Sequence, residues 1–176
     1  MVRGNHDGPA YFTEEKMTHE RFRTMPDYSV VSACGHQILC VGGAISIDRS
    51  FRLAEMRRHP DKQYYWPNEP THYDALLMEE LAAAGVKIDT VVTHTAPSFC
   101  ELQTKNGLTS WAVNDPDLLQ DCDNEREQMD LLLKHLLRDQ HPVTHWFYGH
   151  FHQSWHGEKL GILFKMLDIM ELHELR

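Results

Sequence analysis

Three short stretches of the chain place asparagine or histidine beside residues that favour loops, and these side chains could bind a metal ion. A neutral imidazole is the commonest nitrogen ligand of transition metals in proteins, and an asparagine oxygen is an acceptable oxygen ligand. The stretches are Gly4-Asn5-His6-Asp7, Val91-Val92-Thr93-His94-Thr95 and Gly149-His150-Phe151-His152. The whole chain has 13 histidines, so candidate ligands have to be identified by their positions in the sequence.

The positions of these histidines relative to strands strengthen the metal hypothesis. His94 and the His150/His152 pair each follow a predicted β-strand, and ligands of α/β proteins bind at such strand ends. In an extended segment, residues two apart point to the same side, so His150 and His152 can address one centre or two adjacent metals. A lone Asn-His pair indicates only a turn, and a lone histidine only a half-buried residue. The combination, in this order, predicts a metal site.

Runs of β-branched and aromatic residues separated by turn formers predict the strands that carry these loops. Gly35-His36 would turn a first hairpin, and Gly157-Glu158-Lys159 a closing one. The order of strands and helices along the chain indicates an α/β domain. Strands are predicted at residues 28–34, 37–42, 87–94, 143–148, 153–155 and 160–169.

Two helices are predicted between these strands. The first covers about residues 72–84, with Thr71 as its cap and Gly85 at its end. The second is long, with Asp115 as its cap and Pro116 at its first position. Its apolar stripe consists of Leu118, Leu119, Cys122, Met129, Leu132, Leu133, Leu136 and Leu137. Loops are expected at residues 4–9, 96–114 and 47–70, the last with one short helix, and long loops are often functional.

The composition is that of a soluble protein with one core. The 176 residues are 41% hydrophobic, and the formal net charge of −9 argues against a general nucleic-acid-binding protein. No apolar run approaches the length of a membrane span, so we expect no membrane association and a cytoplasmic location. The four cysteines form no Cys-x-x-Cys pair and are expected to be reduced thiols. A small anionic substrate remains compatible with the charge, because a bound metal can invert the local field.

The three stretches resemble the last three signature blocks of the calcineurin-like metallophosphoesterase superfamily. Its five blocks run Asp-x-His, Gly-Asp, Gly-Asn-His-Asp/Glu, His and Gly-His-x-His, and the resemblance covers Gly4 to His152. It implies an α/β fold, a sandwich of β-sheets flanked by helices. Only Met1, Val2 and Arg3 precede Gly4, so the first two blocks are missing. We therefore expect residues 1–176 to form a single, N-terminally incomplete domain without its N-terminal strands.

The resemblance also implies a role for each matching residue. Asn5, His94 and His150 match ligands of the second metal, and His152 matches a ligand of the first. His6 matches the histidine that stabilises the developing charge and protonates the leaving oxygen. The implied reaction is hydrolysis of phosphate mono- or diesters by a metal-activated hydroxide, with Mn, Fe or Zn as cofactor. The family binds two metals, whereas the residues present here would hold one or none.

The missing blocks leave several interpretations open. In the family they supply the bridging carboxylate and the other ligands of the first metal. The chain could therefore be a fragment, an inactive degenerate homologue that acts as a metal-binding or interaction module, or a protein completed by another chain. Unpaired strands and an exposed apolar sheet face would favour a homodimer or a covering partner.

The substrate is left largely open by the sequence. We expect a small phosphorylated molecule, and the Thr95-Ala96-Pro97 sequence after His94 departs from the Ser/Thr protein phosphatases. Arg49 and Arg52 lie in the long loop after Gly43 and are candidate phosphate-binding residues. The alternative for both arginines is the solvated face of a loop or short helix.

Overall fold

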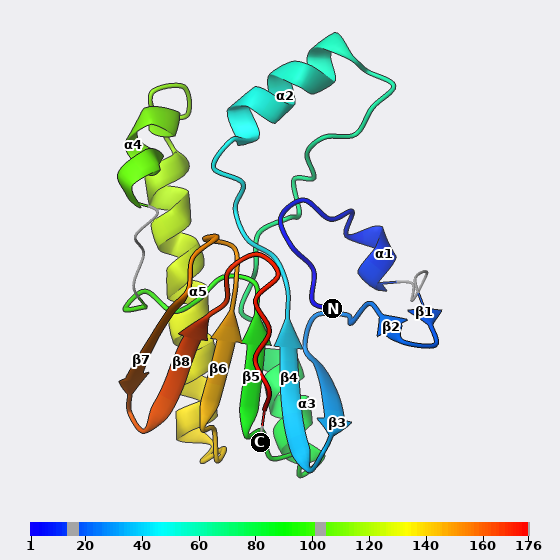
Figure 1. Cartoon of the computed structure of the whole chain (residues 1–176), viewed down its shortest axis with the longest axis vertical. Coiled ribbons are helices and arrows are strands. Elements are labelled where there is room, and N and C mark those ends of the chain that lie inside the picture. Colours follow the sequence, from blue (N-terminus) through cyan, green and yellow to red (C-terminus); the bar gives the residue numbers. More distant parts are fainter. Residues whose placement is uncertain (14–17, 101–104, 176) are drawn as a thin grey trace.

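The computed structural model describes residues 1–13, 18–100 and 105–175, and its centre is a six-stranded sheet (Figure 1). The strand order is β3-β4-β5-β6-β8-β7, and β4, β5, β6 and β8 run parallel while the two edge strands are antiparallel to their neighbours. The strands are β3 (Ser29–Ala33), β4 (His36–Val41), β5 (Thr90–Thr93), β6 (His145–Tyr148), β7 (Trp155–Lys159) and β8 (Ile162–Met166). Each strand of this sheet lies in or overlaps a predicted region, and the mixed α/β class is confirmed.

The two hairpins show where the turn predictions hold and where they fail. The turn between β3 and β4 contains Cys34 and Gly35, both with positive φ, close to the predicted position. The closing hairpin turns at Leu160 and Gly161, also with positive φ, and the predicted turn at residues 157–159 is wrong. Gly157 pairs with Phe164 inside the ladder, where an added Cβ would lie 2.6 Å from the Trp155 ring. This glycine makes room for an aromatic ring, and a two-residue turn needs the left-handed conformations found at 160 and 161.

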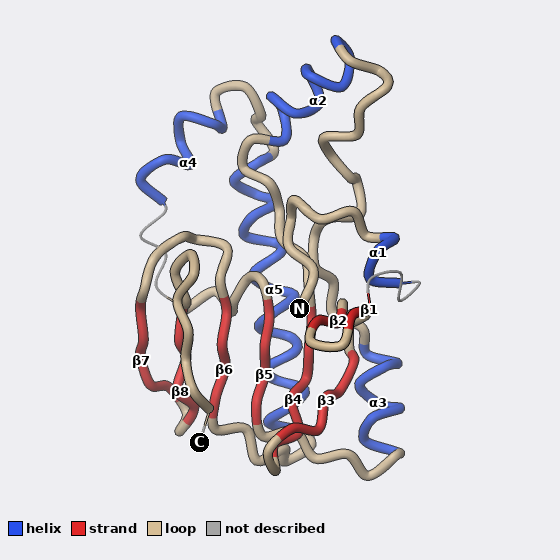
Figure 2. The backbone as a smooth tube through the Cα atoms, turned by 45° about the vertical axis from the view of Figure 1, so that its right-hand side comes forward, coloured by secondary structure: helices blue, strands red, loops and turns tan. Residues whose placement is uncertain are grey.

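Helices α3 (Ala75–Ala83) and α5 (Leu118–Arg138) cover one face of the sheet (Figures 1 and 2). Asp74, and not Thr71, caps α3, because its side chain accepts a hydrogen bond from the Leu77 amide at 3.0 Å. Helix α5 begins three residues after Asp115, so the predicted cap is wrong there too. The Asp115 carboxylate instead accepts hydrogen bonds from Arg49.

The remaining elements lie around the upper end and one side of the sheet. Helix α2 (Arg49–Arg58) is the short helix expected in the long loop, whereas α4 (Lys105–Ala112) lies in a segment predicted to be a loop. Both helices are found beyond the ends of the parallel strands (Figure 1). Helix α1 (Ala10–Thr13) and the two-stranded sheet of β1 (Thr18–His19) and β2 (Phe22–Arg23) lie beside the edge strand β3.

A row of inward-facing side chains across four strands forms the centre of the core. The sheet register pairs Leu39 with Val91, Val91 with Trp146, and Trp146 with Phe164, and all four are at most 1% exposed. Met129, Leu132 and Leu136 of α5 pack against this row, which confirms most of the predicted helix stripe. Leu119 and Leu137, which were also assigned to the stripe, are 42% and 39% exposed, because they lie at its margin.

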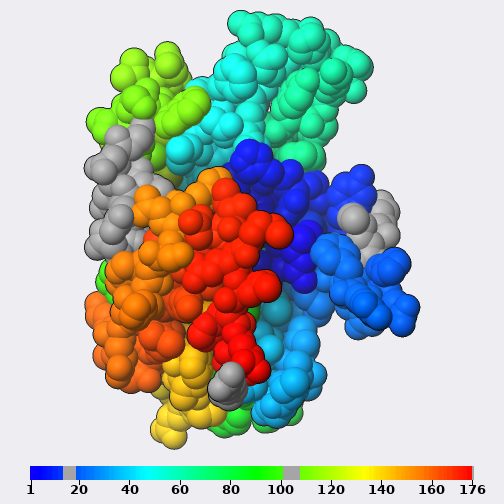
Figure 3. All heavy atoms as spheres, in the orientation of Figure 1, coloured from blue at the N-terminus to red at the C-terminus, as the bar shows by residue number. Residues whose placement is uncertain are grey.

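The opposite face of the sheet is crossed by the C-terminal segment, residues 167–175 (red in Figures 1 and 3). The His173 ring lies 5.1 Å from the Phe147 ring, and Glu171 is 3.6 Å from the Lys165 ammonium. This segment covers part of the face that we expected a partner to cover, and a homodimer stays a prediction. None of the described helices combines the length and the apolar character needed to cross a membrane.

Candidate metal centre

The predicted metal-binding loops meet at the C-terminal ends of the parallel strands. His94 directly follows β5, and Gly149 to His152 follow β6, so the two loops leave neighbouring strands at the same edge. The Gly149 amide donates a hydrogen bond to the His94 carbonyl oxygen at 3.2 Å, which joins the loops. The segment that carries Asn5 runs alongside, and its Arg3 carbonyl accepts a hydrogen bond from the Gly43 amide at 2.7 Å.

The three residues predicted as ligands of one metal, Asn5, His94 and His150, form a trio of neighbouring side chains. The Nε2 atom of His94 lies 3.1 Å from the Oδ1 atom of Asn5, and the His94 and His150 rings are 5.0 Å apart in an edge-on arrangement. Asn5 is 7% exposed, and an added Cβ on Gly4 would lie 3.3 Å from the His94 ring. The glycine before Asn5 therefore lets the backbone approach His94 closely. The Asn5 oxygen thus faces the His94 ring, and the His94 ring in turn neighbours the His150 ring.

Burial keeps both of these imidazoles neutral at neutral pH. It lowers the pKa of His94 to about 4, against the opposing influence of Asp7. It also lowers the pKa of His150 well below its ordinary value, and the nearby His94 and Arg126 add to the effect. A neutral imidazole has a free nitrogen lone pair, which is the form that binds a metal.

The backbone of the Gly149–His152 loop is unusual. His150 and His152 have φ angles of 70° and 51°, in the left-handed region that non-glycine residues seldom adopt. The Phe151 amide donates to the Gly149 carbonyl oxygen at 2.9 Å, which tightens the loop. Strain of this kind concentrates at functional sites. His152 is exposed, and its proximity contributes to the low pKa of His94 and His150, so it lies next to the trio and not within it.

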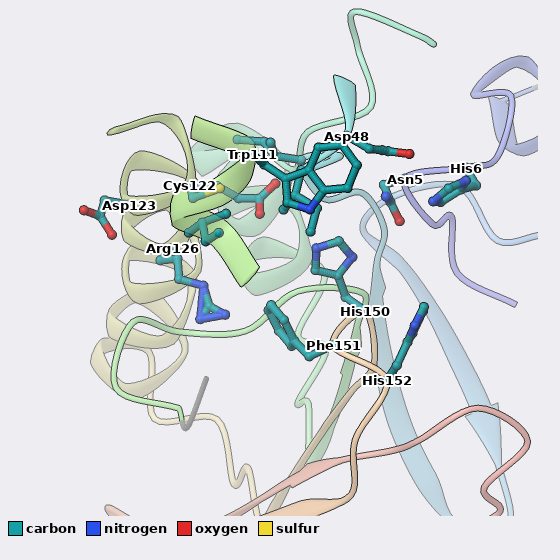
Figure 4. A pocket seen from close by; sticks show the side chains of 14 residues that line it. Asn5, His6, Asp48, Trp111, Cys122, Asp123, Arg126, His150, Phe151 and His152 are labelled. Atoms are coloured by element: carbon teal, nitrogen blue, oxygen red, sulfur yellow. The ribbon is translucent and has the colours of Figure 1, made fainter. Parts of the chain in front are cut away.

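His6 lies on the other side of Asn5 and is held by an arginine. Its ring nitrogens contact the guanidinium of Arg52, which is 6% exposed and also forms a 2.8 Å ion pair with Asp48. Burial, followed by the charge of Arg52, lowers the pKa of His6. His6 and Asp48 both line the pocket that Asn5 and His150 also line (Figure 4).

Arg49, the other predicted phosphate ligand, is engaged elsewhere. Its guanidinium pairs with Asp115 at 2.5 Å and with Asp121 at 2.7 Å, which links α2 to the start of α5. These carboxylates raise the pKa of Arg49 above its ordinary value. Phosphate binding by Arg49 stays a prediction, because its charge is already shared by two carboxylates.

Two residues that the sequence analysis missed orient Asn5. The Asn5 amide nitrogen donates to the Ser46 hydroxyl at 3.0 Å, and that hydroxyl donates to the Glu69 carboxylate at 3.0 Å. Glu69 also accepts from the Ser46 amide at 2.6 Å and is fully buried. Because the Ser46 hydroxyl directs its proton to Glu69, a lone pair of the hydroxyl oxygen faces the Asn5 amide nitrogen. The Asn5 side-chain oxygen is therefore turned toward His94. Nothing in the sequence around Glu69 marks it as part of a site.

A second missed pair, Glu125 and Arg126, lies on the buried side of α5. They are 6% and 5% exposed and line the same pocket as His150. Burial raises the pKa of Glu125 to about 8, against the charge of Arg126. The signal was present in the sequence, because these charges stand between Cys122 and Met129 at the helical spacing of the apolar stripe.

The donor set fits one divalent transition metal more closely than two. Asn5, His94 and His150 supply one oxygen and two nitrogens, which suits Mn, Fe or Zn with water completing the shell. Among the described residues, no three or more His, Cys, Asp or Glu side chains are grouped so as to hold an ion. The trio lies between two pockets. Asn5 and His150 line the first, and His94 and His150 line the second, together with His152, Asp7 and Asp168.

Comparison with known proteins agrees with this geometry. The family model for calcineurin-like phosphoesterase matches residues 1–154, which include all three loops of the site. The search of curated proteins returned no match. The matched region also contains the parallel strands β4, β5 and β6 that position the loops, and the mixed α/β architecture is consistent with that fold. The chain therefore belongs to the calcineurin-like phosphoesterase family.

Proposed function

We propose that this chain is a metal-dependent hydrolase of small phosphate mono- or diesters. The observation that carries the proposal is the convergence of Asn5, His94 and His150 next to His6 and Arg52. Two neutral imidazoles and an oriented amide oxygen suit a divalent metal, and an imidazole beside a guanidinium suits a phosphoryl group. A bound metal would supply an activated hydroxide and neutralise charge on the phosphoryl oxygens.

The protein residues have separate tasks in this proposal. Asn5, His94 and His150 hold the metal, and His152 faces the open side of the site. His6 stabilises the developing charge and delivers a proton to the leaving oxygen, as general acids of this kind do. Arg52 keeps the His6 ring in place and presents its positive charge to the phosphoryl group, while Asp48 holds Arg52 through its ion pair.

A second candidate function is a metal-binding or interaction module without turnover. It is favoured because the described residues contain no group of three or more His, Cys, Asp or Glu side chains that could hold an ion. Such a protein would keep the Asn5–His94–His150 trio and bind one ion. We retain manganese, iron or zinc as the proposed metal and the cytoplasm as the proposed location.

Hydrolysis and metal binding by the same preparation separate the two candidates. The chain is supplied with Mn²⁺ and assayed with p-nitrophenyl phosphate and bis(p-nitrophenyl) phosphate, in parallel with Mn²⁺ titration by calorimetry. The phosphoesterase proposal expects metal-dependent turnover that falls by about 10²–10⁴-fold in His6→Ala while Mn²⁺ affinity is unchanged. Background turnover with intact Mn²⁺ binding supports the second candidate, and the absence of Mn²⁺ binding contradicts both.

A further inference from the structure

A pocket of about 320 Å³ extends from the metal-binding trio toward α4 and α5. Its volume is within the range of small-molecule sites. Much of its wall is apolar, and Figure 4 shows Trp111 and Phe151 on either side of His150. The apolar lining residues are Ile45, Ile47, Leu108, Trp111 and Phe151. This pocket can accommodate a flat apolar group that is attached to a phosphoryl group at the metal.

Arg126 contributes a buried cation to this pocket. It is 5% exposed, and its Nη2 atom has no hydrogen-bond partner among the residues described. Its Nη1 atom donates a long hydrogen bond of 3.5 Å to the Pro97 carbonyl oxygen. Leaving a buried donor unpaired is unfavourable, and more so when the donor is charged. A guanidinium that keeps a free donor in a pocket is therefore well suited to an anionic ligand.

The acidic neighbours leave the charge of Arg126 largely uncompensated. No ion pair joins Arg126 to Glu125 in the described part of the chain, and burial raises the pKa of Glu125 to about 8. The Asp123 carboxylate points away from Arg126 and His150 (Figure 4). Asp48 lies at the far end of the pocket, where it pairs with Arg52.

A line of rings connects Arg126 to the metal-binding trio. The His94 and His150 rings are 5.0 Å apart, and the His150 and Phe151 rings are 4.8 Å apart. The Arg126 guanidinium carbon lies 4.8 Å from the centre of the Phe151 ring. Phe151 therefore lies between the Arg126 guanidinium and the His150 ring. A ligand with one planar ring can span from Arg126 to His150.

We propose that Arg126 binds a second anionic group carried by the leaving part of the substrate. The substrates would then be phosphate esters whose leaving group combines a flat apolar body with a carboxylate or a second phosphate. The inference rests on the proposed function, since it takes the phosphoryl group to lie at Asn5, His94 and His150. Trp111 and Phe151 contact the apolar body, and Arg126 selects for its charge.

Three related probes test this proposal by binding alone. They are 4-(phosphonomethyl)benzoate, which carries both anions, benzylphosphonate, which lacks the carboxylate, and 4-methylbenzoate, which lacks the phosphonate. Each is titrated by calorimetry into the Mn²⁺-supplied full chain, into Arg126→Met, and into Arg57→Met as a control at an exposed arginine of α2. Phosphonates resist hydrolysis, so the measurement does not depend on turnover.

We expect the wild-type chain to bind the two-anion probe about tenfold or more tightly than benzylphosphonate, because a charged hydrogen bond is gained. Arg126→Met should abolish this difference and retain benzylphosphonate binding, which also shows that the variant is folded. Arg57→Met should behave like the wild type. Equal binding of the two phosphonates by the wild type overturns the proposal even if the variant does not fold.

The probes also separate this inference from the proposed function. If benzylphosphonate and the two-anion probe bind no better than 4-methylbenzoate, the phosphonate adds nothing and the phosphoesterase site itself is contradicted. If the phosphonate contributes but the carboxylate gives the same gain in Arg126→Met as in the wild type, only the role of Arg126 is wrong. Loss of benzylphosphonate binding in a folded Arg126→Met chain also contradicts the inference, since it assigns Arg126 a structural task.

Discussion

The Oδ1 atom of Asn5 lies 3.1 Å from the Nε2 atom of His94, although 89 positions separate the two residues in the chain. The contact exists because β5 ends at Thr93, next to β4, and the segment before Asn5 crosses the end of β4 at Gly42 and Gly43. The sheet thus creates the site by placing loop residues together at one edge. His150 follows the next strand, β6, and completes the group.

Replacement of Asn5, His94 or His150 should weaken metal binding. We expect His94→Ala to weaken Mn²⁺ binding by at least about tenfold, since one of three protein ligands is lost. His156→Ala is the matched control, because His156 is exposed on β7, outside the site. Calorimetric titration of both variants checks the prediction. Equal Mn²⁺ affinity in the two variants would mean that His94 does not bind the metal.

The hydrogen-bond chain behind Asn5 should affect metal affinity without contacting the metal. Ser46→Ala removes the acceptor of the Asn5 amide nitrogen, so the Asn5 oxygen is no longer fixed toward His94. We expect about a tenfold loss of Mn²⁺ affinity, in the range found for residues that orient metal ligands. Ser32→Ala, at an exposed position of β3, serves as the control and should leave the affinity unchanged. An unchanged affinity in Ser46→Ala would show that Asn5 is oriented by other contacts.

The two arginines of α2 should differ in their effects. Arg52→Met is expected to lower kcat/KM for p-nitrophenyl phosphate by about tenfold or more, because the guanidinium contacts His6. Arg49→Met should instead lower the free energy of unfolding by about 1–3 kcal/mol, since it leaves Asp115 and Asp121 without their partner. Steady-state kinetics and thermal melts of both variants measure these effects. A larger loss of activity in Arg49→Met, with unchanged stability, would reverse the two assignments.

The sequence predicted the parts of the site that depend on local patterns. Histidines after strands could be placed at one sheet edge because buried strands and their order can be recognised from apolar runs. The tertiary hydrogen bonds could not be predicted in this way. Asp115 has the residue type of a helix cap, but its ion pair with Arg49 depends on how α2 packs against α5. Glu69 is an unmarked residue of a long loop until the fold brings it to Ser46.

Gly42, the first of the two glycines after β4, should affect both the stability of the chain and its metal binding. A Cβ on Gly42 would lie 2.6 Å from the Arg3 Cβ and 2.7 Å from its backbone nitrogen, so Gly42→Ala has to displace the segment that carries Asn5. We expect a destabilisation of about 1–3 kcal/mol together with weaker Mn²⁺ binding. Gly35→Ala is the control, since its positive φ costs about 1 kcal/mol while its surroundings are open and distant from the site. Weaker Mn²⁺ binding in Gly35→Ala to the same degree would mean that general destabilisation, and not displacement of Asn5, causes the effect.

Glu125 should make the stability of the chain fall as the pH rises. Burial raises its pKa from an ordinary value of 4.5 to about 8 in the folded chain. Between about pH 4.5 and pH 8 the folded state keeps a proton that the unfolded state has released, so the free energy of unfolding decreases through this window and is level above it. Glu125→Gln cannot ionise and lacks this loss.

The measurement is the difference in melting temperature between Glu125→Gln and the wild type at several pH values. We expect a difference near zero at about pH 4.5 that grows by roughly 9–17 °C toward pH 8, which corresponds to on the order of 4 kcal/mol. The low pKa values of His94 and His150 have the opposite effect on stability, but both proteins contain them, so they cancel in the difference. A difference that stays constant would mean that Glu125 is ionised even at acidic pH. Its carboxylate would then neutralise Arg126, and the pocket would lose the free cation that selects for a second anion.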